Sequence, residues 1–415
     1  MSSVVPEGWS EEYISEYFDF CIGGTPSRNN ELYWDANQTT SNIWVSIKDL
    51  KDKFISNSAE RISDLGVSKS NVKLLPKNTV LMSFKLSIGR LAISMTPLYT
   101  NEAIVGFIEK RPNTVDRDYL YYGLQSWNLL GEVDQAVKGA TLNKDKMSRI
   151  LGVFPPLPEQ KKIASILTSV DEVIENTQKQ IDKLQDLKKA TMNELLTKGI
   201  GHTEFKDSEL GRIPKSWEVG KFDDFMLSDL TYGLTVRPKY QSLGVPLVSG
   251  KECKNGWIDF SIANLISEDD FVGLRQRSLP KVGDVLFTKT GTLGRIAVVK
   301  AEYPKFALSQ NVALLTPDFN VVVPKFLAYL CESESIKQQT KLGASTLSVQ
   351  DLQLGIMRKF RVPKVPIDEQ YNIIKVIDAL GLRLDRVERK LSQTQSLKKS
   401  LMQDLLTGKV RVTVN

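Results

Sequence analysis

The sequence contains two copies of one long helical segment, and this duplication constrains the fold more than any other feature. Residues 159–197 align without a gap with residues 369–407, at a constant offset of 210 (369 minus 159). A chain built twice from one unit can present two similar binding surfaces related by an internal two-fold axis. The identical positions include Glu159-Gln160 and Glu369-Gln370, Leu187-Lys188-Lys189 and Leu397-Lys398-Lys399, and Leu195-Leu196-Thr197 and Leu405-Leu406-Thr407.

Both copies have the heptad spacing of a coiled coil, because apolar residues recur at alternating steps of four and three. In the first copy the a and d positions are Ile163, Leu167, Val170, Ile174, Thr177, Ile181, Leu184, Lys188, Thr191 and Leu195. In the second copy they are Ile373, Ile377, Leu380, Leu384, Val387, Leu391, Thr394, Lys398, Leu401 and Leu405. About 39 residues give roughly 58 Å of helix. Average helices run about 11 to 12 residues, so the alternative of two ordinary core helices is disfavoured.

The regions before each helix repeat more loosely. Alternating residues at 79–94 and 284–299 predict β-hairpins, and helical stretches follow at 118–130 and 324–340. The predicted fold class is α+β: two globular mixed α/β domains separated by two long helices, which an internal pseudo-two-fold requires to form an antiparallel coiled coil. The expected segments are a first globular domain at 1–154, a spacer helix at 155–200, a linker and second globular domain at 201–362, and a second spacer helix with a C-terminal tail at 363–415.

Residues that carry chemistry are scarce. His202 is the only histidine, which disfavours a catalytic triad or a multi-histidine metal site. The three cysteines, Cys21, Cys253 and Cys331, follow no ligand spacing and suggest reduced thiols. Gly250-Lys251 lacks the other residues of a phosphate-binding loop. We therefore expect no catalytic residue, no metal site and no cofactor in this chain.

The composition is that of a folded protein, with 41% hydrophobic and 25% charged residues. No apolar run approaches the roughly 18 residues of a membrane span, and the first ten residues lack the pattern of a signal peptide. We expect a cytoplasmic protein that has no membrane partner.

The charge distribution points to double-stranded DNA. The net charge is +6 and the pI is about 8.9, which is only mildly basic. Basic residues nevertheless gather in matching loops and hairpins of both globular domains, beside hydroxyl and amide residues of the kind that contact phosphates and base edges. A solvated surface charge is the alternative for any single lysine, and hairpin anchoring is the alternative for Arg90 and Arg295. The candidate DNA-binding residues are Thr25, Ser27, Arg28, Lys48, Lys85, Arg90, Thr141, Lys144, Arg237, Lys251, Lys289, Thr290, Arg295 and Thr346.

Several motifs together are typical of one known family. They are Pro155-Pro156-Leu157-Pro158-Glu159-Gln160, Val365-Pro366-Ile367-Asp368-Glu369-Gln370, the two Leu-Leu-Thr helix ends, Gly23-Gly24-Thr25-Pro26-Ser27 and Lys138-Gly139-Ala140-Thr141-Leu142. With them the chain resembles the specificity (S) subunits of type I restriction-modification systems. The resemblance covers essentially the whole chain, and copy two departs from the family pattern at residues 232–238 and 343–347.

The resemblance implies that each globular domain is a target recognition domain for one half of a split DNA sequence. It also implies that the helices dock methyltransferase (M) subunits, usually two, and that the complex recruits restriction (R) subunits. Adenosylmethionine, ATP and Mg²⁺ would then belong to these partner subunits. Two other classes stay open from the residues alone: a coiled-coil scaffold whose globular domains bind protein, and an enzyme with a diverged methyltransferase site.

Overall fold

The computed structural model describes residues 5–85, 87–129, 142–236, 238–254, 256–273, 278–345 and 349–414. The chain forms two compact units, and each combines one globular domain with parts of both long helices. Unit 1 comprises Met1–Lys179 and Arg389–Asn415, and unit 2 comprises Gln180–Glu388.

Unit 1 is built on a five-stranded sheet of order β2-β9-β6-β7-β4, a three-stranded sheet of order β5-β3-β8, and the pair β1-β10. Its strands are β1 (Ser10–Tyr13), β2 (Phe18–Ile22), β3 (Ile43–Val45), β4 (Phe54–Ile55), β5 (Glu60–Arg61), β6 (Val80–Ser83), β7 (Leu91–Ser94), β8 (Tyr99–Thr100), β9 (Ile104–Glu109) and β10 (Leu151–Phe154). Its helices, beside parts of α5 and α10, are α1 (Asp64–Lys69), α2 (Arg117–Ser126), α4 (Lys144–Ser148) and the 3-10 turns η1 (Ile14–Glu16), η2 (Glu31–Tyr33) and η3 (Ile47–Asp49).

Unit 2 repeats this plan with a four-stranded sheet of order β14-β22-β19-β20, a three-stranded sheet of order β18-β15-β21, and the pairs β13-β23, β16-β17 and β11-β12. Its strands are β11 (Phe205–Ser208), β12 (Gly211–Pro214), β13 (Glu218–Lys221), β14 (Thr231–Tyr232), β15 (Val245–Val248), β16 (Cys253–Lys254), β17 (Trp257–Ile258), β18 (Asn264–Ile266), β19 (Val285–Thr288), β20 (Ile296–Val298), β21 (Ala307–Leu308), β22 (Val312–Leu315) and β23 (Arg361–Lys364). Its shorter helices are α6 (Glu268–Val272), α7 (Pro324–Glu332), α8 (Glu334–Gly343), α9 (Leu354–Met357), η4 (Phe222–Phe225) and η5 (Phe260–Ile262).

The expected hairpins are present as β6–β7 and β19–β20. The helix expected at 324–340 is divided at Ser333, whose hydroxyl accepts a hydrogen bond from the Ile336 amide (3.3 Å) and caps α8. A serine that caps a helix in this way ends the preceding one because its own backbone is extended. The hairpins lie over α2 in unit 1 and over α7 in unit 2.

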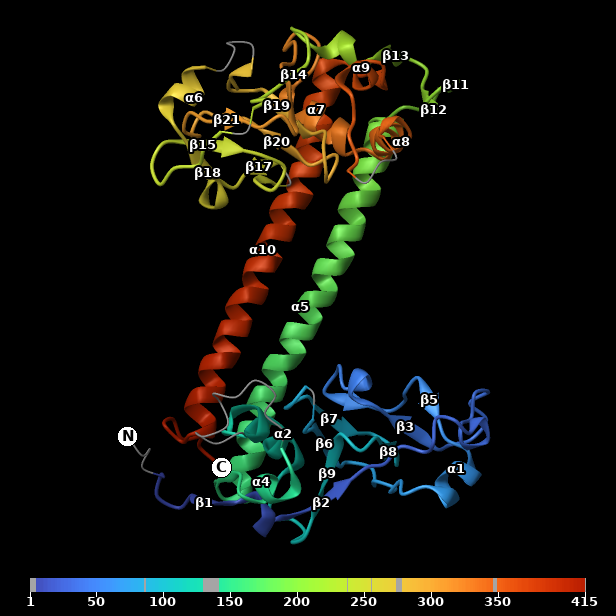
Figure 1. The fold of residues 1–415 in the computed structure, drawn as a ribbon, viewed down its shortest axis with the longest axis vertical. Helices are drawn as coiled ribbons and strands as arrows, with labels where there is room; N and C mark the ends of the chain where they lie inside the picture. The colour runs from blue at the N-terminus through green and yellow to red at the C-terminus, as the bar shows by residue number, and fades with distance from the viewer. Residues whose placement is uncertain are drawn as a thin grey trace. The chain divides into compact units, whose positions relative to one another are not determined.

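The predicted long helices are continuous in the structure, as α5 (Leu157–Lys198) and α10 (Ile367–Leu406) (Figure 1). In unit 1, Leu167 near the start of α5 shares a core with Leu405 at the end of α10. In unit 2, Leu196 at the end of α5 shares a core with Ile373 near the start of α10. The helices are therefore antiparallel within each unit. All the predicted a and d residues are buried or half-buried, which confirms the heptad assignment.

Each globular domain is fixed to its helix by a buried glutamine at the helix start. In unit 1, Gln160 Oε1 accepts a hydrogen bond from the Asp116 amide (2.8 Å), and Nε2 donates to the carbonyls of Thr114 (3.1 Å) and Pro155 (2.8 Å). Asp116 is the N-cap of α2. Through one amide group, Gln160 therefore joins α5 to the segment before α2 and to the end of β10.

Gln370 repeats this arrangement in unit 2. Its Oε1 accepts from the amide of Val323 (2.8 Å), the N-cap of α7, and its Nε2 donates to the carbonyls of Val321 (3.0 Å) and Val365 (2.8 Å). Gln160 is 2% exposed and Gln370 is fully buried. Buried amides are stable only when hydrogen-bonded, so both junctions depend on a complete set of partners.

The preceding glutamate binds a tryptophan in both units and a different third residue in each. Trp9 Nε1 donates to Glu159 Oε2 (3.0 Å), and Trp217 Nε1 donates to Glu369 Oε2 (2.9 Å). The third partner is Arg411 for Glu159. The hydrogen bond from Arg411 lowers the pKa of the Glu159 carboxyl below its usual value. Burial opposes this effect, and the hydrogen bond from the Trp9 N–H adds to it.

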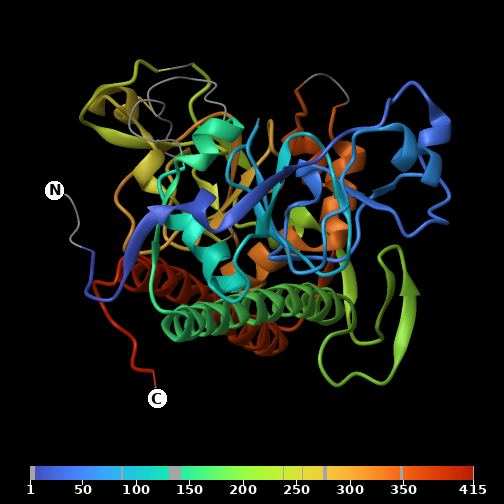
Figure 2. The same ribbon diagram turned by 90° about the horizontal axis from the view of Figure 1, so that it is seen from below.

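In unit 2 the third partner is the imidazole of His202, 2.8 Å from Glu369 Oε1. The two glutamate sites therefore share a tryptophan and differ in the third partner, which is a guanidinium in unit 1 and an imidazole in unit 2. In unit 1, Gly408 packs so closely on Pro6 that an added Cβ would lie 2.4 Å from the proline ring. Residues 6–9 and 408–411 thus lie side by side at the end of α10 (Figure 2).

Candidate nucleic-acid interface

The hairpins β6–β7 and β19–β20 have the same turn. The hydroxyl of Ser83 accepts from the Arg90 amide (3.0 Å), and that of Thr288 accepts from the Arg295 amide (2.8 Å). A glycine with positive φ precedes each arginine and donates to the carbonyl of the same Ser or Thr, at 2.9 Å in both units. Arg90 and Arg295 are therefore structural equivalents, as the sequence alignment predicted.

The two hairpin lysines, both candidate DNA contacts, occupy different positions of their hairpins. The Phe84 amide donates to the Ala103 carbonyl, and the Lys289 amide donates to the Asn311 carbonyl, both at 2.9 Å. Lys289 thus occupies the place of Phe84, one position earlier than Lys85. A shift of one residue turns a strand side chain to the other face, so the two lysines have different surroundings.

Lys85 is exposed, whereas the side chain of Lys289 is only 13% exposed and its Nζ lies 2.8 Å from Asp351 Oδ1. Thr290 also donates its hydroxyl proton to Asp351. Lys289 and Thr290 therefore fasten the hairpin of unit 2 to the segment before α9. Lys85 is free to meet a phosphate.

The two arginines also differ in their side chains. The guanidinium of Arg295 donates to the Gly250 carbonyl (2.8 Å) and anchors its hairpin to the loop after β15. Arg90 is exposed, and its guanidinium has no hydrogen bond or ion pair within the described residues. The anchoring alternative thus describes Arg295, and Arg90 is the arginine of the pair that is available to a ligand.

In unit 1 the predicted turn at residues 25–28 is held by internal pairs. The guanidinium of Arg28 stacks 3.7 Å above the Trp34 ring and binds Glu60, with Nη2 3.2 Å from Oε2. Lys48 Nζ lies 3.5 Å from the same carboxylate. The Arg28 hydrogen bond, with the charges of Arg28 and Lys48, lowers the pKa of Glu60 against the effect of burial. Half of the Arg28 side chain remains exposed, so its edge can still meet DNA.

Thr25 donates its hydroxyl proton to Glu102, which lowers the pKa of that carboxyl. The carbonyl of Ser27 accepts from Trp34 Nε1 (3.2 Å). Carboxylate and tryptophan partners therefore fix the turn that the sequence assigned to DNA contact. The same contacts take up part of its hydrogen-bonding capacity.

The remaining candidates are distributed more widely. Lys144 is exposed at the first residue of α4. Lys251 is 52% exposed and donates to the Ile262 carbonyl (3.1 Å), with Glu252 Oε1 at 3.3 Å. Thr141, Arg237 and Thr346 lie outside the described residues.

Unit 2 has a cavity of about 320 Å³ where β15, β18 and the loop from β21 to β22 meet. We call it the amide cavity. Its polar lining includes the side chains of Asn264, Gln310 and Asn311, for which the described part of the chain offers no hydrogen-bond partner. Its apolar lining consists of Leu234, Val236, Pro238 and Leu247, beside Tyr240.

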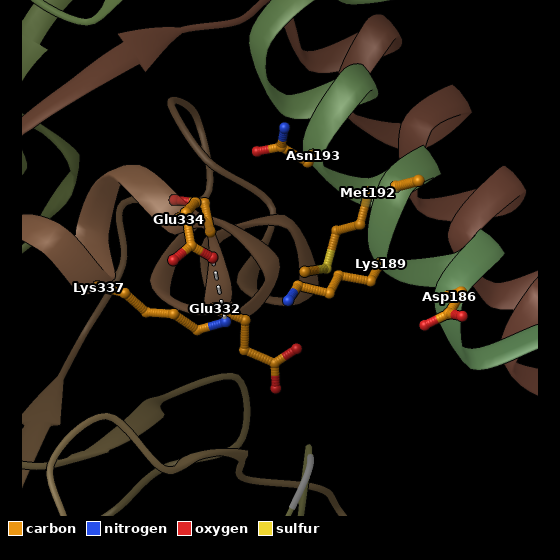
Figure 3. A pocket seen from close by; sticks show the side chains of 9 residues that line it. Asp186, Lys189, Met192, Asn193, Glu332, Glu334 and Lys337 are labelled. Carbon is orange, nitrogen blue, oxygen red and sulfur yellow. Dashed lines mark ion pairs between the residues drawn. The ribbon is translucent and has the colours of Figure 1, made fainter. Parts of the chain in front are cut away.

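A second cavity, of about 400 Å³, lies between α5 and the α7–α8 junction of unit 2 (Figure 3). Lys189 and Met192 of α5 project toward Glu332 and Lys337. Burial raises the pKa of Glu332, and the nearby Lys188 and Lys337 oppose that rise. This cavity has mixed charge and a mostly apolar wall, and its α5 side is part of the repeated helix.

Within the described residues, no three His, Cys, Asp or Glu side chains are grouped as metal ligands. Cys21, Cys253 and Cys331 are free thiols, and burial raises the pKa of each. The helices in the described ranges include none that is long and apolar enough to span a bilayer.

Comparison with known proteins identifies the family. The family described as type I restriction modification DNA specificity domain matches the chain twice, at residues 6–186 and 214–394. The chain belongs to this family. Type I restriction-modification specificity proteins recognise DNA targets, so DNA recognition is the function that family membership implies.

Specificity subunits and their structures align with nearly the whole chain. The MjaIX specificity subunit of Methanocaldococcus jannaschii is 24% identical, over 98% of this chain and 95% of the relative. A solved structure from work on complex assembly and conformational transition of the type I R-M system has a TM-score of 0.65 at 13% identity, covering 98% of this chain and 99% of that one. The S subunit of M. genitalium has a TM-score of 0.54 at 16% identity, covering 100% and 98%. These structures share the two-domain fold with paired long helices.

In this specificity-family chain, sequence reasoning missed the three amides of the amide cavity. Asn264, Gln310 and Asn311 are not basic and belong to none of the family motifs. One signal was present: Ser309-Gln310-Asn311 stands between two apolar strands, at the position where unit 1 has Asn101-Glu102-Ala103. Aligning the strands on both sides would have marked this polar loop.

Proposed function

We propose that the chain is a specificity subunit that reads a bipartite DNA target, with one half-site contacted by each unit. The observation that carries this proposal is the repeated junction at Gln160 and Gln370, which fixes two globular domains to two helices in the same way. Two domains held in equivalent frames suit two separate half-sites. We assign Arg28, Lys85 and Arg90 of unit 1 to DNA contact because each has an exposed cationic group.

A domain exchange tests this assignment. Residues 1–154 are replaced by the equivalent domain of a relative, and the methylated motif of the host genome is sequenced. We expect one half of the motif to change and the other to persist. A chimera that assembles and methylates but changes both halves would contradict independent reading. A chain that gives no methylated motif and binds random and specific duplexes alike would favour the protein-binding scaffold.

We further propose that α5 and α10 dock two M subunits through equivalent exposed leucines. Leu187 is 48% exposed and Leu397 is 52% exposed, and they are the same position of the repeat. Exposed large apolar side chains at matching helical positions favour a protein interface.

Introducing a negative charge at these leucines tests the docking surface. Leu187→Asp and Leu397→Asp should each remove one M subunit from the assembly, as measured by native mass spectrometry, and the double variant should remove both. Gln403→Asp, an exposed change on α10, is the matched control. Retention of both M subunits by the double variant would exclude this surface.

Catalysis and its cofactors are assigned to the partners: adenosylmethionine to the M subunits, and ATP and Mg²⁺ to a complex that includes R subunits. The chain itself acts by binding, in the cytoplasm with its DNA. Calorimetry with adenosylmethionine tests this division, because the isolated chain should give no binding heat and the assembled methyltransferase should give a saturable one. Saturable binding by the isolated chain would favour the diverged-methyltransferase alternative.

The length of the continuous helices is proposed to set the gap between half-sites. Inserting four residues between Gln178 and Gln185 adds about 6 Å of helix, or roughly two base-pair steps. The preferred gap should grow by about one or two base pairs, with both half-sites unchanged. A variant that folds, assembles and methylates only the original spacing would show that the length of the helix does not set the gap between half-sites.

A further inference from the structure

We propose that the amide cavity of unit 2 reads an A·T base pair from the major groove, an inference that rests on the proposed DNA recognition. The cavity presents the side-chain amides of Asn264 and Asn311, with Gln310 at its rim. Each amide carries both a donor and an acceptor. An amide can bind adenine through N6 and N7 at once, and this pairing distinguishes adenine from the other bases. Three amides that lack protein partners are therefore suited to a base edge.

The remainder of the lining supports a base pair over other ligands. Among the described residues that line the cavity there is no Lys, Arg, Asp or Glu side chain. Leu234, Val236 and Leu247 supply apolar surface beside the amides. The 5-methyl group of thymine is the apolar feature of the major groove. Amides beside apolar surface thus match the two halves of an A·T pair.

The backbone connects the cavity to the hairpin of unit 2. The carbonyl of Asn311 accepts from the amides of Lys289 (2.9 Å) and Thr290 (3.4 Å), so the hairpin and the amide loop form one surface. The Leu234 amide donates to the Leu308 carbonyl (2.7 Å), which closes the cavity from the other side. The amides are therefore held by main-chain contacts, and their side chains do not support the fold.

The equivalent strand position of unit 1 holds a larger side chain. Trp44 pairs with Tyr99 as Leu247 pairs with Ala307, so Trp44 takes the place of Leu247. The indole is 2% exposed and donates to the Gly24 carbonyl (2.9 Å), filling the equivalent space. By the same register Glu102 takes the place of Gln310. The amide reading is therefore proposed for unit 2, where Leu247 and Gln310 replace Trp44 and Glu102.

The test uses the full chain assembled with its M subunits and a duplex carrying the methylated motif. Each adenine in the half-site of unit 2 is replaced in turn by 7-deazaadenine, which lacks the N7 acceptor. At one position affinity should fall roughly tenfold to a hundredfold. Asn264→Ala and Asn311→Ala should weaken binding of the normal duplex and lose this sensitivity, because the partner of N7 is already gone.

Controls separate the possible causes. Gln353→Ala removes an exposed amide outside the cavity and should leave the sensitivity intact. At the adenine that is methylated, any sensitivity of binding to 7-deazaadenine is expected to come from contacts with the M subunit. That sensitivity should therefore persist in the alanine variants. Leu247→Trp copies unit 1 and should abolish the effect by filling the cavity. Because that variant adds bulk to a buried strand, the alanine variants decide the outcome.

Three results would overturn the inference while specific binding persists: a half-site without an A·T pair, 7-deazaadenine sensitivity that the alanine variants retain at every position, or an affinity that rises when the pair is mismatched. The last result would indicate a base extracted from the duplex. Loss of all sequence preference in the unmodified complex would instead contradict the proposed function itself.

Discussion

The junctions and the candidate nucleic-acid interfaces of the two units have diverged to very different degrees. At the junctions, Gln160 and Gln370 make the same three hydrogen bonds to the same parts of the fold. At the surfaces, unit 1 fills a space with Trp44 and an Arg28–Trp34 stack, whereas unit 2 leaves an amide-lined cavity. A frame fixed by a few buried polar contacts can therefore carry two unlike surfaces.

The helices show an intermediate case. Lys398 Nζ lies 2.7 Å from Asp171 Oδ1 in unit 1. The same two positions of the repeat in unit 2 hold Lys188 and Gly381, and an added Cβ at Gly381 would lie 3.7 Å from the Lys188 ammonium. Unit 2 thus retains the cation of this pair without the anion.

Breaking the shared junction should have the largest effect. Gln160→Met and Gln370→Met keep the side-chain volume but leave one buried amide N–H and two carbonyls without partners. We expect each to destabilise its own unit by about 2–4 kcal/mol. Denaturant unfolding followed by hydrogen exchange of each unit measures this loss, with Gln403→Met as the exposed control. Equal losses would support equivalent junctions, and a loss confined to one unit would refute them.

Replacing Glu159, beside the junction of unit 1, should reduce the stability of the unit by a smaller amount, and this loss should depend on pH. Glu159→Gln keeps an acceptor for Trp9 but removes the carboxylate that binds Arg411, and should cost unit 1 about 1 kcal/mol at neutral pH. The folded pKa of Glu159 is lowered, so its contribution is complete above the unfolded pKa and is lost as pH falls through the folded one.

Unfolding at neutral and acid pH measures this difference. The stabilities of the wild type and Glu159→Gln should converge below about pH 4. Glu194→Gln, an exposed pair on the same helix, should show little difference at either pH. A gap that stays constant with pH would exclude the carboxylate charge as its cause.

Placing an anion opposite Lys188 in unit 2 should raise the stability of that unit. The expected gain is similar to or smaller than the loss caused by Glu159→Gln. Gly381→Asp places a carboxylate opposite Lys188, as Asp171 is placed opposite Lys398. We expect a stabilisation of about 0.5–1 kcal/mol, from the reduced chain entropy of the unfolded state and a partly exposed ion pair. Thermal unfolding measures the gain, and Gly381→Asn separates the backbone part from the charge. If both variants stabilise equally, no ion pair has formed.

The smallest effect concerns the two hairpin lysines. Lys85→Ala should lower the salt dependence of DNA binding by about 0.9 in slope with little change in stability, as expected for one phosphate contact. Lys289→Ala should instead lower the melting temperature of unit 2, because it leaves Asp351 without its cation. Titrations at several salt concentrations measure the slope. Equal slope changes in the two variants would contradict their different placement.

The sequence was sufficient to predict the elements that have a regular spacing of apolar residues. The long helices followed from their heptads, because a and d residues must face a partner at every turn. The hairpins followed from alternation, and Arg90 was correctly aligned with Arg295. These features depend on local spacing, which the residues display directly.

Features that depend on contacts between distant segments were not predicted. Lys289 was grouped with Lys85 as a DNA contact, whereas its surroundings are set by an ion pair with Asp351, which lies far along the chain. The amide cavity exists because Leu247 is smaller than Trp44 and three separate segments meet beside it. The spacing of residues within one segment carries no information about the size of the side chain on a neighbouring strand.

The two units differ in the time at which all of their residues become available during synthesis. Unit 2 is one continuous stretch, Gln180–Glu388, whereas unit 1 also needs Arg389–Asn415. Trp9 and Glu159 emerge early from the ribosome, but Leu405 and Arg411 complete their core and ion pair only after all of unit 2 has been made. Unit 1 must therefore remain partly unfinished on the ribosome, with the apolar face of α5 uncovered, while unit 2 already has all the residues of its own core.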